Sequence, residues 1–282
     1  MKDYKVAAIQ MVSGNDLDAN LATVKRLVTD AVTAGAQLVV LPETFAVFST
    51  RAQYSLGVQE ASAAAVVRPF IAALAANLGV WIVAGSIPLV GDAPEHEAPT
   101  EKVYSACLLF NDKGEEVARY NKIHLFDVDV GDQQGSYRES DAFLAGSDVV
   151  VVDTPFGRLG LSVCYDIRFP EFFRAMFLQR VDIISVPAAF TLHTGKAHWL
   201  ALLRARAIEN QCYIIGANQG GEHSSKRSTS GGSVIIDGWG TALAEMDMGE
   251  GYVIADVNPE SVSKLRSAMP IEHHMRFAVE QK

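Results

Sequence analysis

The chain carries the stretch GLSVCYDIRFPE at residues 160–171, in which an apolar run ends abruptly at a thiol, Cys164. Residues 158–163 read as a buried strand, and a polar, turn-forming segment follows them. Most free cysteines are simply buried core residues. The segment after Cys164 is too polar for a strand that continues through a core. The sequence therefore favours a nucleophile that a strand end presents beside free backbone N–H groups.

Apolar runs and amphipathic segments alternate along the rest of the chain, which is typical of an α/β fold. We expect strands at residues 6–10, 38–41, 80–87, 103–110, 149–153, 158–163, 183–186, 213–217, 234–237 and 252–256. We expect helices at residues 16–34, 59–77, 170–179, 196–210 and 259–267. The polar segment at residues 121–146 should be irregular and functional. No linker interrupts the pattern, so we predict one domain over residues 1–282, with its sheets covered by helices.

The composition is that of an acidic globular protein, with 49% apolar residues among 282 and a formal net charge of −9. The negative charge argues against nucleic acid or an anionic membrane as the main partner. The three cysteines are odd in number and lack metal-like spacing, which indicates reduced thiols. The sequence shows neither a signal-peptide pattern nor an apolar run of membrane-spanning length. We therefore expect a cytoplasmic protein.

Two further polar residues stand where a strand ends or an irregular segment begins. Glu43 ends the run LVVLPE at residues 38–43, and Lys122 opens the irregular segment in NKIHLF at residues 121–126. Taken singly, each would usually be a solvated surface residue. A thiol needs a base or a nearby cation to become a nucleophile, and histidine is the familiar partner. None of the seven histidines can be paired with Cys164 by spacing, so a Cys–His hydrolase stays open on these grounds alone.

The motifs LPE at residues 41–43, NKIH at 121–124 and CYDIRFPE at 164–171 occur in this order, together with LRARAIEN at 203–210. In this combination the chain resembles the nitrilase superfamily of carbon–nitrogen hydrolases over essentially its whole length. The resemblance implies a four-layer α-β-β-α sandwich. It also implies paired subunits, as a homodimer or a higher homo-oligomer, with helices near Cys164 and at residues 196–210 in the interface.

The resemblance assigns roles to individual residues. Glu43 would be the general base, Lys122 the cationic stabiliser and Cys164 the nucleophile, and Glu139 would be a second active-site glutamate that positions Lys122 or the substrate. The backbone N–H of Tyr165 would help to bind the oxyanion. The implied chemistry is hydrolysis of a terminal amide to an acid and ammonia through a thioester. It requires neither a metal nor an organic cofactor.

Several segments resemble the branch that holds deaminated glutathione amidase and omega-amidase: HLFDVD at residues 124–129, YRES at 137–140, AHW at 197–199 and KR at 226–227. Substrates of this branch are anionic amides of α-keto acids, so a local cation is expected. The candidates are Arg138, His193 and Lys196, with Phe190 and Thr194 shaping the pocket.

Two alternatives remain at this stage. One is another activity of the same family, as an N-carbamoyl amidohydrolase or a nitrilase. The other is a catalytically silent binding protein on the same fold, against which the complete set of Glu43, Lys122 and Cys164 argues. The remaining charged residues of the motifs are expected to support the site through ion pairs: Asp166, Arg168, Glu171 and Glu209.

Overall fold

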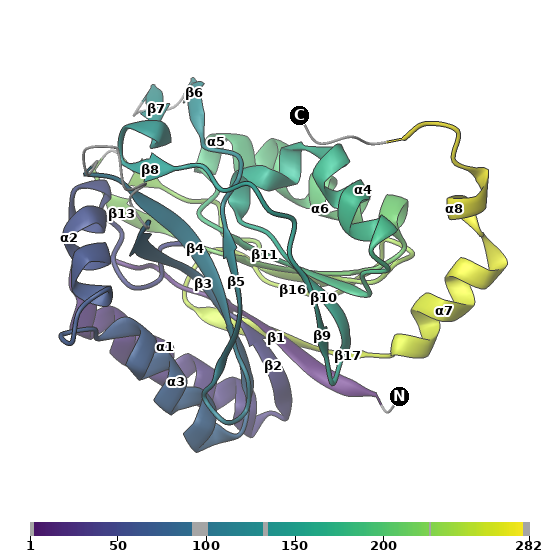
Figure 1. Cartoon of the computed structure of the whole chain (residues 1–282), viewed down its shortest axis with the longest axis horizontal. Helices are drawn as coiled ribbons and strands as arrows, with labels where there is room; N and C mark the ends of the chain where they lie inside the picture. Colours follow the sequence, from purple (N-terminus) through teal and green to yellow (C-terminus); the bar gives the residue numbers. More distant parts are fainter. Residues whose placement is uncertain (1–2, 92–100, 132–134, 226, 279–282) are drawn as a thin grey trace.

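Two β-sheets face each other at the centre of the molecule (Figure 1). The computed structural model describes residues 3–91, 101–131, 135–225 and 227–278. The first sheet has the strand order β17 (Gly251–Val257), β1 (Tyr4–Gln10), β2 (Ala36–Val40), β3 (Trp81–Val90), β4 (Val103–Phe110) and β5 (Glu116–Asn121), with β8 (Phe143–Leu144) beside β4. The second sheet has the order β16 (Ala242–Glu245), β15 (Val234–Ile236), β12 (Tyr213–Asn218), β11 (Ile183–Ala188), β10 (Gly157–Leu161) and β9 (Val151–Thr154).

Helices cover the outer face of each sheet, as the view in Figure 1 shows. The first sheet carries α1 (Leu17–Thr33), α2 (Thr50–Glu60) and α3 (Val67–Leu78), and the second carries α4 (Pro170–Leu178) and α6 (Leu200–Asn210). The C-terminal segment adds α7 (Pro259–Ala268) and α8 (Ile271–His274). The predicted four-layer α-β-β-α sandwich is confirmed. Within the described ranges, no helix has the length and apolar character that crossing a membrane would require.

Strand β1 explains how the two cores are separated. Successive side chains of a strand point to opposite faces of the sheet. Ala7 and Ile9 pack with α1 and α3 in the outer core, whereas Val6 and Ala8 pack toward the second sheet in the inner core. Both faces of the strand are therefore buried, which is why it reads as a continuous apolar run.

Strand direction brings the predicted site residues to one end of the sandwich. Strands β1, β2 and β3 are parallel, and β5 runs in the same direction because β4 is antiparallel to both of its neighbours. Glu43 follows the end of β2 and Lys122 follows the end of β5, so both lie at the same edge of the first sheet. In the second sheet, β10 leads to Cys164.

Most predicted elements are present, and the strands expected at residues 149–153 and 158–163 pair as β9 and β10, but the helix expected at residues 59–77 is wrong. The structure has two helices, α2 and α3, in its place. The carboxylate of Glu60 accepts hydrogen bonds from the backbone N–H groups of Val66, Val67 and Arg68, at 2.8 to 2.9 Å. These groups begin α3 and have no partner inside the helix, so Glu60 caps a new helix instead of continuing the old one.

Two other segments differ from expectation. The helix expected at residues 196–210 is α6 preceded by a π-helical turn, Gly195–Trp199. The segment at residues 121–146 is not wholly irregular, since it contains the hairpin of β6 (Asp127–Asp129) and β7 (Ser136–Arg138) and a 3-10 turn, Glu139–Asp141. A second small hairpin joins β13 (Glu222–Ser224) and β14 (Arg227–Ser228). Both hairpins contribute residues to the cavity described below.

Candidate active site

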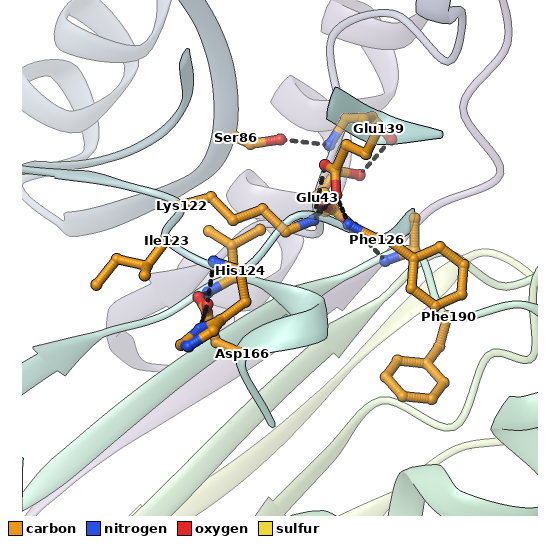
Figure 2. A network of polar contacts seen from close by, with 12 residues as sticks. Glu43, Ser86, Lys122, Ile123, His124, Phe126, Glu139, Asp166 and Phe190 are labelled. Carbon is orange, nitrogen blue, oxygen red and sulfur yellow. Dashed lines mark hydrogen bonds and ion pairs between the residues drawn. The ribbon is translucent and has the colours of Figure 1, made fainter. Parts of the chain in front are cut away.

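Glu43 lies just beyond the end of β2, where the backbone is tightly constrained. Thr44 has a left-handed φ of 54°, and its N–H donates to the Ser86 Oγ at 2.9 Å (Figure 2). Strand β3 passes so close that a Cβ atom on Gly85 would lie 2.1 Å from the carbonyl oxygen of Pro42. A residue larger than glycine would displace this turn. The local sequence therefore fixes the direction of the Glu43 side chain.

Lys122 connects the two candidate carboxylates. Its Nζ donates to Glu43 Oε1 at 2.9 Å and to the two carboxylate oxygens of Glu139 at 2.8 and 2.9 Å (Figure 2). Only 1% of Lys122 is exposed. The predicted proximity of Glu43 and Lys122 is present, and Glu139 joins them from the 3-10 turn after β7.

The charges of this cluster favour an ammonium on Lys122. Burial alone lowers the pKa of Lys122, but the nearby carboxylates of Glu139 and Glu43 outweigh burial and raise its pKa well above the ordinary value. Burial raises the pKa of Glu139, and the Lys122 ammonium opposes that rise. Glu139 also accepts a hydrogen bond of 2.6 Å from the N–H of Phe126. A fixed positive charge therefore lies between two carboxylates in a nearly dry environment.

Cys164 begins the 3-10 turn Cys164–Arg168 with a left-handed φ of 46°. Such a conformation is uncommon for residues other than glycine and is typical of a sharp turn that exposes a nucleophile. Burial raises the pKa of the Cys164 thiol well above its ordinary value, and the negative charge of Glu43 raises it further. The thiol is therefore protonated at rest, and it needs a base at the moment of attack.

Asp166 ties the Cys164 turn to the strand that leads to Lys122. Its carboxylate is fully buried and accepts hydrogen bonds from the Val163 N–H at 2.8 Å and the Tyr120 hydroxyl at 2.7 Å. It also accepts from the His124 N–H at 3.2 Å and lies 2.7 Å from His124 Nδ1 (Figure 2). The His124 ring stacks on Phe169 at 3.7 Å. Asp166 was predicted to support the site through an ion pair, and it does so mainly through this network.

Other supports of the site were not predicted from the sequence. The Ala189 N–H donates to Glu43 Oε2 at 3.0 Å, and Gln219 Nε2 donates to the Glu43 carbonyl oxygen at 3.0 Å. Ala189 directly follows β11, and Gln219 directly follows β12, so both come from the ends of strands of the second sheet. Arg206 donates through Nε and Nη2 to the carbonyl oxygen of Ile167 and pairs with Glu209 at 2.8 Å. The predicted supporting role of Glu209 therefore operates through Arg206.

The cluster opens into a cavity of about 370 Å³. The walls include all four predicted catalytic residues and four of the five predicted binding residues: Glu43, Lys122, Glu139, Cys164, Tyr165, Arg138, Phe190 and Thr194. The fifth, His193, is exposed on the short helix α5 (Leu192–Thr194) and does not line the cavity. Lys196 is also exposed and does not line it.

Arg138 lines the cavity but is already paired. Its Nη2 donates to both oxygens of Asp129, at 2.9 and 3.1 Å, and its Nη1 donates to the Val128 carbonyl oxygen at 3.1 Å. The residues lining the cavity that the sequence did not mark as site residues include Phe48, His223 and Arg227. His223 and Arg227 belong to the β13–β14 hairpin, whereas Phe48 precedes them by more than 170 residues, so no spacing marked Phe48 as their neighbour. Lys226, which was paired with Arg227 as a marker of the branch, lies outside the described residues.

Metal binding finds no support in the arrangement of donors. Across the part of the chain that the structure describes, no three His, Cys, Asp or Glu side chains are grouped so that they could hold a metal ion. The chemical resources of the cavity are an ammonium between two carboxylates, a thiol and backbone N–H groups. This set suits nucleophilic attack on a polarised carbonyl.

Comparison with known proteins identifies the family of the chain. The sequence pattern of the carbon–nitrogen hydrolase family matches residues 5–267. The chain belongs to the carbon–nitrogen hydrolase family. Deaminated glutathione amidases from Yersinia enterocolitica and Synechocystis sp. are 40% and 42% identical to it. Each comparison covers 98% of this chain, with 94% of the Yersinia protein and 100% of the Synechocystis protein.

A solved structure of this family has the same fold. The NitFhit protein of Caenorhabditis elegans matches with a TM-score of 0.86 and 34% identity, over 98% of this chain and 66% of that longer chain. The family prediction made from the three motifs is confirmed. This carbon–nitrogen hydrolase is an amidohydrolase, as its curated relatives are.

Proposed function

We propose that this carbon–nitrogen hydrolase cleaves an amide of a small carboxylate-bearing substrate through a thioester on Cys164. Deaminated glutathione, or a similar omega-amide of an α-keto acid, is the proposed substrate. One observation carries the mechanism: the Lys122 ammonium is held between Glu43 and Glu139 in the cavity that also receives the Cys164 thiol. The reaction needs these groups together, as base, electrostatic stabiliser and nucleophile.

In the first half-reaction the Cys164 thiol gives its proton to Glu43 while the sulfur bonds to the amide carbonyl carbon. The raised pKa of the thiol, caused first by burial and then by Glu43, makes transfer during attack preferable to a resting thiolate. Negative charge develops on the carbonyl oxygen, where the Lys122 ammonium and the Tyr165 N–H stabilise it. The carbon–nitrogen bond then breaks, and Glu43 returns the proton to the departing nitrogen.

In the second half-reaction a water molecule replaces the amine. Glu43 takes a proton from the water as its oxygen bonds to the thioester carbonyl carbon, and Lys122 again stabilises the oxyanion. The carbon–sulfur bond breaks, and Glu43 returns the proton to the Cys164 sulfur. One carboxylate thus acts as base and acid in both halves. The Ala189 N–H donates to this carboxylate, and the Gln219 side chain donates to the backbone carbonyl of Glu43, so both contacts hold the residue in position.

The relatives named deaminated glutathione amidase support the substrate class. In deaminated glutathione the amide joins a keto acid to a dipeptide, so its hydrolysis releases a dipeptide amine. A simple omega-amide such as 2-oxoglutaramate releases ammonia instead. The acyl product, 2-oxoglutarate, is common to both.

The three cysteines, Cys107, Cys164 and Cys212, are all free, which agrees with a reducing compartment. We propose the cytoplasm as the location of the protein.

The proposal is tested in two ways, by comparing rates across a panel of substrates and by detecting the acyl group on the enzyme. It compares deaminated glutathione, 2-oxoglutaramate, an N-carbamoyl amino acid, a simple amide and a nitrile. We expect the highest kcat/KM with the first two; preference for the carbamoyl compound or the nitrile would refute the proposed substrate. Mass spectrometry after rapid acid quench should detect an acyl group on Cys164. Cys164→Ala should abolish turnover and keep the fold, while Cys212→Ala, a change at a fully buried thiol outside the cavity, should keep kcat.

A further inference from the structure

Arg227 lies in the cavity between two aromatic rings. Its guanidinium carbon is 5.2 Å from the centroid of the Phe48 ring and 4.9 Å from that of the Tyr137 ring. Phe48 stacks in turn on His223, with centroids 3.7 Å apart and planes inclined by 8°. The Tyr137 ring packs against Phe126 at 5.1 Å. Cation–π contacts of this kind hold a guanidinium without using its hydrogen-bond donors.

Hydrogen bonds hold the His223 ring that stacks on Phe48. His223 Nδ1 lies 2.8 Å from the Ser13 carbonyl oxygen, and its Nε2 lies 2.7 Å from the Thr229 hydroxyl. Burial lowers the pKa of His223 to about 4, so the ring is neutral near pH 7 and does not repel the guanidinium. Arg227 is therefore a preorganised cation whose position is fixed by its neighbours.

The charge of Arg227 has no acidic partner among the described residues. Lys122 lies between two carboxylates and Arg138 is paired with Asp129, but no described carboxylate forms a salt bridge with Arg227. Its Nε is buried and has no hydrogen-bond partner in the described part of the chain. A buried donor without a partner is costly, and a ligand that supplies the acceptor recovers that cost.

Resting on the proposed function, we infer that Arg227 binds the free carboxylate on the acyl part of the substrate and so determines specificity for anionic amides. The planar guanidinium can donate two parallel hydrogen bonds to a carboxylate, and such charge-assisted pairs are strong. The other charged groups of the cavity cannot supply this contact as well. Lys122 is needed at the carbonyl oxygen, and Glu43 and Glu139 would repel an anion. Arg227 thus binds the substrate at its carboxylate, while Lys122, Glu43 and Cys164 act at the amide carbonyl.

The inference is tested with Arg227→Gln and two matched substrates, 2-oxoglutaramate and its methyl ester. With the carboxylate substrate, we expect KM to rise about 10- to 100-fold while kcat changes less than about threefold. With the ester, both constants should stay within about twofold of the wild-type values. Arg227→Lys should have a KM between those of Arg227→Gln and the wild type, because the positive charge returns without the bidentate geometry. Binding of the product 2-oxoglutarate, measured by calorimetry, should weaken in parallel.

Arg174 offers a matched control. It also lies over an aromatic ring, that of Phe177 at 4.7 Å, and its Nη1 is also buried without a partner among the described residues, but it lies away from the cavity. Arg174→Gln should leave the KM for both substrates unchanged.

The outcomes separate the two proposals. If the wild type prefers the carboxylate substrate and Arg227→Gln affects acid and ester equally, or neither, the role of Arg227 is wrong and the proposed function stands. If the wild type does not prefer the acid over the ester, both fail. If Arg227→Gln does not fold, as judged by circular dichroism, the decision rests on Arg227→Lys. An unchanged KM and unchanged product binding in that variant would overturn the inference.

Discussion

The Tyr120 hydroxyl donates a hydrogen bond of 2.7 Å to the Asp166 carboxylate, and this contact joins the strand before Lys122 to the turn that carries Cys164. The two residues are 46 positions apart in the sequence: Tyr120 lies on β5 of the first sheet, and Asp166 lies in the 3-10 turn that follows β10 of the second sheet. The same carboxylate accepts from the N–H of Val163, the residue before the nucleophile, at 2.8 Å. The relative position of the ammonium and the thiol therefore depends on one buried group.

Replacing Asp166 should damage both stability and catalysis. In Asp166→Asn an amide NH2 replaces one acceptor oxygen, so at least one of the donors from Tyr120, Val163 and His124 loses its partner inside the core. We expect the free energy of unfolding to fall by about 1–3 kcal/mol and kcat by at least about tenfold. Urea unfolding and steady-state kinetics measure the two effects. Asp153→Asn, at an exposed ion pair with Arg158, should cost less than about 1 kcal/mol; equal losses in both variants would refute the role of Asp166.

Replacing Glu139 should affect turnover more than substrate binding. Glu139→Gln keeps the shape and one acceptor for the Phe126 N–H, but it removes a negative charge from the Lys122 ammonium. Lys122 would then be held mainly by Glu43 and drawn toward the base. We expect kcat to fall about 10²- to 10³-fold, as for the loss of one oxyanion-stabilising group, with a KM change below about threefold. Asp141→Asn, at an exposed carboxylate of the same turn, is the control. Near-normal kcat in Glu139→Gln would show that Lys122 does not need the second carboxylate.

His223 should make stability depend on pH. Burial lowers its pKa from 6.5 to about 4 in the folded protein, whereas the unfolded chain titrates near the ordinary value. Between these values the unfolded state binds more protons, so this group's contribution is complete above about pH 6.5 and is lost as the pH falls toward 4. At about 1.4 kcal/mol for each pH unit between 6.5 and 4, the loss is at most about 3.5 kcal/mol. Urea unfolding of the wild type and His223→Gln at pH 7, 5.5 and 4 should show a smaller decrease in the variant. Parallel curves would contradict the shift.

The sequence predicted the parts of the site that lie at strand ends. Glu43 and Cys164 each follow an apolar run, and the parallel strands of such a fold end at one edge. Lys122 follows β5, a strand too polar and exposed to be recognised beforehand. Its place came from the family resemblance and not from periodicity.

The site residues that the sequence did not predict are brought together by contacts between distant segments. Phe48, Tyr137 and Arg227 lie in three different loops or hairpins, and only the packing of the two sheets brings them together. Their sequence neighbours contain no spacing that marks a shared site. The break between α2 and α3 escaped for a similar reason, because Glu60 caps a helix that begins several residues later, through a bend in the chain.

The expectation of paired subunits leads to a prediction about the outer helices of the second sheet. Leu178 on α4 and Ile208 on α6 expose 45% and 49% of their surface, and the two helices are neighbours in the region where the interface is expected. We expect the wild type to sediment as a dimer or a larger oligomer, and Ile208→Glu to shift it toward the monomer, because a charge buried in an apolar interface is costly. Val58→Glu places the same charge at an equally exposed apolar residue, at 45%, on α2 of the first sheet, and it should leave the oligomer intact. Sedimentation velocity distinguishes these outcomes, and a monomeric wild type would refute the expectation.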